Sequence, residues 1–184
     1  MRKKTLLNIL LILLVLSFFV TPIGYHGKIL LNRIFSFSPE IIPPAERETL
    51  ASYDWKLKDS DWNFINFMRS EGKVVFINFW ASWRLPSAAE LKGIQELYNR
   101  YGDRVDFYII TNEEREPVEA FMEEHDFNFP VTFMIIGEKS PVETESVPRS
   151  YIIDKKGRVV VAQEGIADWD NDTIYNLLNT LIEE

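Results

Sequence analysis

Three segments near the middle of the chain alternate between strand and helix patterns of hydrophobic residues. Residues 73–80 form a continuous apolar run with β-branched members, which is typical of a strand buried on both faces of a sheet. Residues 86–101 repeat apolar side chains at helical spacing, and Gly102 follows them. Residues 105–111 form a second apolar run. Strand, helix and strand in this order predict a right-handed crossover between two parallel strands.

The flanking segments predict the other elements of an α/β domain with a mixed central sheet and helices on both faces. A short helix is expected to begin at Asp59 or Ser60 and to end at Gly72. The later elements are an acidic amphipathic helix over residues 117–125, a hairpin of residues 150–154 with 159–163, and a closing helix over residues 168–184.

The amino-terminal segment predicts a membrane anchor. Arg2, Lys3 and Lys4 precede an apolar run over residues 6–20. A cleavable signal peptide has the same charged start, and both alternatives stay open, although bulky residues stand where a cleavage site needs small ones. We expect a transmembrane helix within residues 1–24. By the positive-inside rule, the remainder would lie outside the cytoplasm, in the periplasm of a bacterium that has one.

Residues 25–50 are expected to be a linker, and residues 51–184 the folded domain. The linker contains three prolines and no sustained period, although its apolar residues between 29 and 35 could instead extend the anchor or lie at the membrane interface. Three of the 20 basic residues and none of the 28 acidic ones precede residue 24, so the rest has 17 basic and 28 acidic residues, a net charge of −11. This charge argues against a nucleic-acid partner.

The first predicted strand continues directly into the sequence WASWRLPSAAE, residues 80–90. This motif resembles that of the membrane-anchored thiol:disulfide oxidoreductases of the TlpA/ResA type, which carry W-A-T-W-C-x-P-C-x-x-E. The resemblance implies a thioredoxin fold over the domain. Arg84 and Ser87 stand at the two cysteine positions, and the chain contains no cysteine. Disulfide exchange needs a thiolate nucleophile and a second sulfur, so this chain is expected to be redox-inactive.

A second block, VPRSYIIDKKGRV at residues 147–159, is similar to the family's V-P-x-x-aromatic-aliphatic-I-D-x-x-G pattern. In the family this proline is cis, and the backbone of the residue before it pairs with an extended substrate segment. The resemblance therefore implies a cis peptide bond at Pro148 and a polypeptide contact at Val147.

The resemblance also assigns roles to the residues around the replaced cysteines. Trp83, Arg84 and Pro86 are expected to form the contact surface together with Val147 and Pro148. A guanidinium at the nucleophile position either extends into water or binds a partner's carboxylate or carbonyl group. Of the two motif tryptophans, the one that ends the strand, Trp80, is expected in the core.

Glu90 matches an acid that helps transfer protons in the family. Without thiols, we expect it to form a helix cap or an ion pair with Arg84, near the binding surface. Ser87 and Glu90 fit the capping-box spacing at a helix start. Asn78, beneath the motif, is expected to be a hydrogen-bonded strand residue.

The favoured function is a redox-inactive polypeptide-binding or assembly module, with no cofactor and no metal. The alternatives are a hydrolase built on Ser87 and an altered copy that has kept no selected activity. Hydrolysis needs an adjacent base, and the predicted fold places neither His26 nor His125 near the motif. The glutamates of the acidic helix lack the turn spacing and glycine of a calcium loop, and we expect them to form a solvated face.

Overall fold

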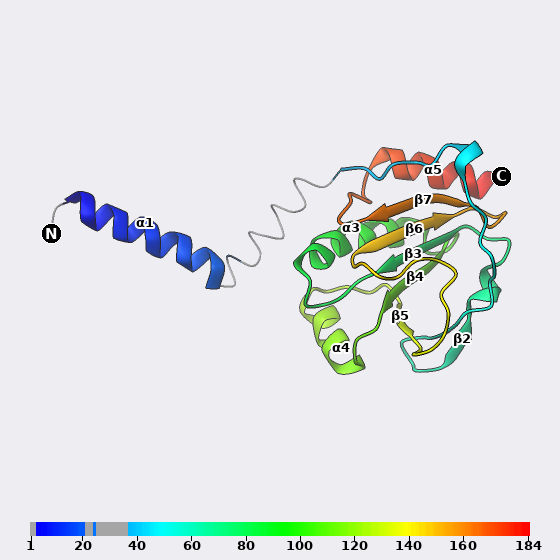
Figure 1. The fold of residues 1–184 in the computed structure, drawn as a ribbon, viewed down its shortest axis with the longest axis horizontal. Helices are drawn as coiled ribbons and strands as arrows, with labels where there is room; N and C mark the ends of the chain where they lie inside the picture. The colour runs from blue at the N-terminus through cyan, green and yellow to red at the C-terminus, as the bar shows by residue number, and fades with distance from the viewer. Residues whose placement is uncertain (1–2, 21–23, 25–36) are drawn as a thin grey trace.

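The computed structural model describes residues 3–20, 24 and 37–184, in which seven strands form one mixed sheet (Figure 1). The strands are β1 (Lys56–Lys58), β2 (Phe64–Asn66), β3 (Val75–Phe79), β4 (Asp106–Thr111), β5 (Val131–Met134), β6 (Arg149–Ile153) and β7 (Val159–Glu164). They lie in the order β2-β1-β5-β4-β3-β6-β7. The α/β class and the mixed sheet expected from the sequence are confirmed.

The expected crossover and hairpin are present. Strand β3 pairs in parallel with β4 and antiparallel with β6, and β6 pairs antiparallel with β7. The turn between β6 and β7 contains Gly157 at a φ of +77°, where a Cβ atom would lie 2.9 Å from the hydroxyl oxygen of Tyr53. A side chain at this position would meet both backbone strain and a close contact.

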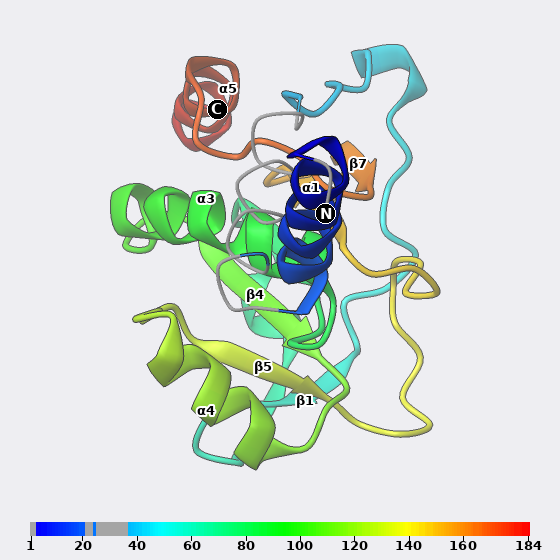
Figure 2. The same cartoon turned by 90° about the vertical axis from the view of Figure 1, so that its left-hand side faces the viewer.

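Three α-helices of the folded domain cover one face of the sheet. They are α3 (Leu85–Tyr101), α4 (Arg115–Glu124) and α5 (Asp172–Glu183), and their buried side chains share one core with Phe76 of β3. Figure 2 shows these helices on one side of the sheet and loops on the other. The opposite face, which carries Ile77, is covered instead by Trp55, Phe67 and their neighbours. The expectation of helices on both faces is therefore wrong for the α-helices of the folded domain, α3, α4 and α5.

The reason is that the predicted helix from Asp59 to Gly72 does not form. Strand β2 and the 3-10 helix η2 (Phe67–Ser70) occupy that segment. The Asp59 carboxylate accepts the backbone N–H groups of Asp61 and Asn63 at 3.0 and 2.9 Å, which closes a hairpin turn instead of capping a helix. Pairing with β1 then satisfies the backbone groups that a helix would have satisfied internally.

The amino-terminal helix α1 (Lys3–Val20) contains the apolar run of the expected anchor. No helix in the described part of the chain is long and apolar enough to cross a bilayer. Residues 1–2, 21–23 and 25–36, where parts of the expected anchor and linker fall, lie outside the described residues.

The described part of the expected linker, residues 37–50, lies against the domain. It includes the 3-10 helix η1 (Pro44–Glu46). Its backbone is hydrogen-bonded to β7 on both sides of η1, from Ile42 N to Val160 O and from Val159 N to Glu48 O, each at 2.8 Å. These bonds cover part of the free edge of β7.

Candidate functional site

The sheet brings the two sequence blocks together. In the antiparallel pair of β3 and β6, Phe79 lies opposite Arg149. Trp80, which directly follows β3, therefore lies beside Pro148, which directly precedes β6. The Val147–Pro148 peptide bond is cis, as the resemblance implied. Pro148 itself is buried, whereas Val147 is partly exposed. The motif and the cis-proline segment therefore form one site at the carboxyl end of β3.

The loop between β3 and α3 presents two large side chains to solvent. The Glu113 carboxylate anchors this loop, because it accepts both the backbone N–H and the hydroxyl of Ser82 at 2.6 Å. Trp83 is 68% exposed, and the guanidinium carbon of Arg84 lies 4.9 Å from the centroid of its ring. Arg84 thus extends into solvent with a cation–π contact.

Ser87 occupies a very different environment. It is 1% exposed, and its hydroxyl oxygen accepts the backbone N–H of Ala81 at 3.3 Å. Arg84 is the residue that precedes the first turn of α3, so Ser87 lies inside the helix and the predicted capping box is wrong. The sequence pattern failed because the helix begins three residues earlier than the pattern requires.

Within the described residues, the Ser87 hydroxyl has no hydrogen bond to a side chain that could act as a base. His125 ends α4, where its ring stacks on Phe121 with centroids 4.2 Å apart, and His26 lies outside the described residues. A buried hydroxyl without a described base cannot serve as the nucleophile of a hydrolase.

Glu90 is the centre of a buried polar network beneath the motif. Its Oε1 atom accepts hydrogen bonds from the indole N–H of Trp169 and from the hydroxyl of Ser150, the latter at 3.1 Å. Ser150 in turn accepts the side-chain N–H of Asn78 at 2.9 Å, as expected for a hydrogen-bonded strand residue. Because Glu90 is 2% exposed and bonded to these groups, the predicted ion pair with Arg84 is wrong. Glu90 lies below the contact surface, not on it.

Burial changes the chemistry of this carboxyl group. Loss of hydration raises the pKa of Glu90 from 4.5 to about 8, although the hydrogen bonds from Trp169 and Ser150 oppose the shift. At neutral pH the group is therefore mostly protonated. Its second oxygen, Oε2, and the Oδ1 atom of Asn78 are also buried, and neither has a hydrogen-bond partner in the part of the chain that the structure describes. The site retains an acid of near-neutral pKa, but the chain has no cysteine thiol with which this acid could exchange a proton.

Trp80 packs in the core, as expected, where its ring lies 5.3 Å from that of Phe121. The sequence did not indicate the role of Trp169, because no local pattern connects it with Glu90, 79 residues away. In the described part of the chain, no three Asp, Glu or His side chains converge in a way that could hold a metal ion.

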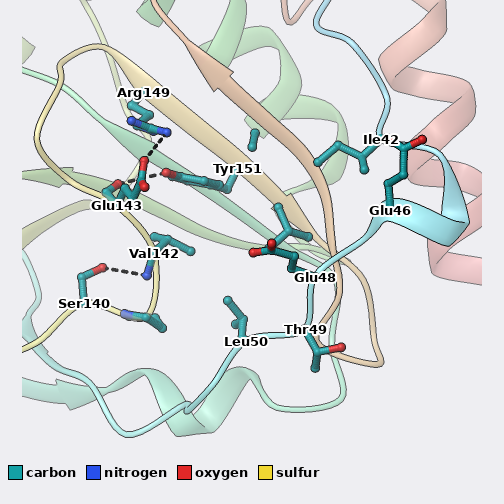
Figure 3. Close-up of a pocket in the computed structure, with 13 residues that line it drawn as sticks. Ile42, Glu46, Glu48, Thr49, Leu50, Ser140, Val142, Glu143, Arg149 and Tyr151 are labelled. Atoms are coloured by element: carbon teal, nitrogen blue, oxygen red, sulfur yellow. Dashed lines mark hydrogen bonds and ion pairs between the residues drawn. The ribbon is translucent and has the colours of Figure 1, made fainter.

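A cavity of about 590 Å³ opens next to the site, on the face of the sheet without α-helices (Figure 3). Val142 and Glu143 line one side of it, and residues between Ile42 and Leu50 line the other. Two β6 side chains hold Glu143: the Arg149 guanidinium pairs with its carboxylate at 2.6 Å, and the Tyr151 hydroxyl donates to its carbonyl oxygen at 3.0 Å.

The residue pattern of the sequence did not predict this cavity. The available signal was the period of two along β6, which places Arg149 and Tyr151 on one face directly after Pro148. The opposite wall comes from residues 42–50, which were expected to be part of a linker. The sequence alone therefore could not show that these residues lie against β6 and complete the cavity.

The sequence is similar to those of known proteins. Residues 51–162 match the model of the AhpC/TSA family. The chain is 30% identical over 162 residues to the thioredoxin-like protein YneN of Bacillus subtilis, covering 85% of this chain and 87% of that protein. It is 31% identical over 170 residues to the thiol-disulfide oxidoreductase ResA of Bacillus cereus, covering 90% and 91%.

Solved structures match the fold. A secreted thiol-disulfide isomerase from Corynebacterium glutamicum has a TM-score of 0.64 at 16% identity, covering 82% of this chain and 98% of that one. A DsbF homologue from Corynebacterium diphtheriae has a TM-score of 0.61 at 16% identity, covering 78% and 99%. At these identities the likeness establishes the thioredoxin-like fold alone.

Proposed function

Because this chain belongs to the AhpC/TSA family, as a cysteine-free thioredoxin-like relative of ResA and YneN, we propose that it binds a polypeptide without exchanging disulfides. Redox inactivity follows from the composition, since no thiolate is available to form a mixed disulfide. The proposed contact surface consists of Trp83, Arg84, Pro86 and the Val147–Pro148 segment, and we refer to it as the motif surface.

The observation that carries this proposal is the exposure of Trp83 beside the stacked Arg84 guanidinium. Large aromatic and arginine side chains dominate the binding energy of protein interfaces. A guanidinium also supplies a planar set of donors for a partner's carboxylate or carbonyl oxygen. Val147, partly exposed before the cis-proline, would provide backbone groups for an extended segment.

Partner capture with matched variants tests this proposal. Trp83→Ala and Arg84→Ala should each weaken capture of a specific partner about tenfold, as expected for interface residues of this kind. Because both side chains are exposed, the melting temperature should change by less than about 2 °C.

The matched control for this test is Arg104→Ala. That guanidinium also lies 4.9 Å from an aromatic centroid, Tyr101, but it follows the opposite end of α3. The control should capture the partner as the wild type does. If Trp83→Ala and Arg84→Ala lost folding and capture in parallel, the two residues would have a structural role instead.

We also propose that the domain lies outside the cytoplasm, tethered through its amino-terminal segment. The support is the positively charged start, Arg2 to Lys4, before the apolar helix α1. Protease added to spheroplasts should digest the domain while leaving a cytoplasmic marker protein intact. Protection of the domain until the membrane is dissolved would reverse the proposed topology.

A further inference from the structure

The cavity beside β6, called here the β6 cavity, has both apolar and polar side chains in its lining. Val142, Leu50, Val159 and the ring of Tyr151 contribute to its lining. Figure 3 shows the Val142 side of the cavity facing the Leu50 side across open space. A volume of about 590 Å³ lies within the range of sites that bury small ligands.

The rim of the β6 cavity carries an excess of negative charge. Glu143 is neutralised by Arg149, at 2.6 Å. Glu46 and Glu48 on the other side are exposed, and neither carboxylate has a hydrogen-bond or ion-pair partner among the described residues. Among the described residues that line the cavity, Arg149 is the one arginine, and its guanidinium is already paired. The carboxylates of Glu46 and Glu48 remain to attract a cation.

We infer that the β6 cavity receives an apolar side chain of an extended polypeptide whose adjacent residue is lysine or arginine. The apolar side chain would contact Tyr151 and Leu50, and the cation would lie near Glu46 and Glu48. The inference rests on the proposed polypeptide-binding function and adds the chemistry of the segment that is bound.

The position of the cavity supports this assignment. Arg149, which lines the cavity, directly follows the Val147–Pro148 segment of the motif surface. An extended chain advances about 3.3 Å per residue, so a polypeptide that pairs beside Val147 reaches the cavity within a few residues. The motif surface and the β6 cavity can therefore engage one continuous segment.

Capped pentapeptides with a central leucine followed by lysine, glutamine or glutamate provide the test. Binding to the full chain is measured by NMR titration or calorimetry at low and high salt. Two exposed ion pairs correspond to about tenfold tighter binding of the lysine peptide than of the glutamine peptide, with the glutamate peptide weakest. High salt should remove most of this difference.

Variants assign the effect to the cavity. Glu46→Gln combined with Glu48→Gln should make the lysine and glutamine peptides bind equally. Glu123→Gln combined with Glu124→Gln removes the same charge from exposed positions of α4 and should leave the tenfold preference intact. Ala162→Trp, at an exposed position that lines the cavity, should obstruct part of it and weaken the binding of all three peptides.

The outcomes separate this inference from the proposed function. Equal binding of the three peptides, a preference for glutamate, or no binding of the lysine peptide at millimolar concentration would overturn the inference. Binding that Trp83→Ala weakens but Ala162→Trp does not affect would also overturn it, while supporting the motif surface. If every motif-surface variant still captured the natural partner as the wild type does, that result would instead count against the proposed function.

Discussion

Raising the pH from 4.5 to 8 should lower the free energy of unfolding by on the order of 5 kcal/mol through Glu90 alone. The pKa of this carboxyl group is about 8 in the folded chain and 4.5 as its reference value. Below pH 4.5 Glu90 is protonated in both the folded and the unfolded chain, so it does not lower the free energy of unfolding there. Between the two values the unfolded state ionises first, so stability falls by about 1.4 kcal/mol per pH unit. Above pH 8 both states are ionised and the loss is complete.

Glu90→Gln isolates this effect, because glutamine is a neutral side chain of the same shape that keeps an acceptor for Trp169 and Ser150. Denaturant unfolding across this pH range should show a much smaller slope for the variant than for the wild type, and greater stability of the variant at pH 9. Glu90→Ala should be less stable at every pH, since it leaves the indole N–H of Trp169 buried and unpaired. Parallel pH profiles of wild type and Glu90→Gln would show that the carboxyl group is ionised in the fold.

Arg84→Cys combined with Ser87→Cys should restore disulfide chemistry to this scaffold. Position 84 is exposed at the start of α3, where the helix dipole lowers the pKa of a thiol, and position 87 is buried in the first turn. The thiol at position 84 would attack a substrate disulfide, and the thiol at position 87 would then displace the substrate as its own disulfide forms. Two electrons and two protons pass to the substrate, whose two sulfurs leave as thiols.

Turnover of a disulfide reporter with an added reductant measures this prediction. The wild type should show only the uncatalysed rate, and neither single variant should turn over. Arg84→Cys should accumulate a mixed disulfide that one sulfur cannot resolve, and the thiol of Ser87→Cys is buried and cannot reach the substrate. Removing the arginine also relieves an unfavourable charge at the helix start, worth about 0.3 to 1 kcal/mol, so the double variant is expected to fold. A folded double variant whose thiols cannot be oxidised to one another would show that the motif has lost its redox geometry.

The sequence by itself determined the elements whose patterns are strong and local. The continuous apolar run before the motif gave strand β3, and helical spacing over the next residues gave α3. The loss of redox activity also needed no structure, because composition alone excludes a thiolate. These conclusions depend on residues close together in the chain, where periodicity and chemistry can be read directly.

Only the tertiary structure decided how distant polar residues are paired. Glu90 fits a helix cap by spacing, yet it lies buried against Trp169, 79 residues later, and that burial raises its pKa. Asp59 has the side chain of a helix cap, yet it closes a hairpin turn because β1 offers a pairing partner. In each case a short-range preference of about 1 kcal/mol yields to larger free energies from burial and strand pairing, which depend on contacts that a linear pattern does not contain.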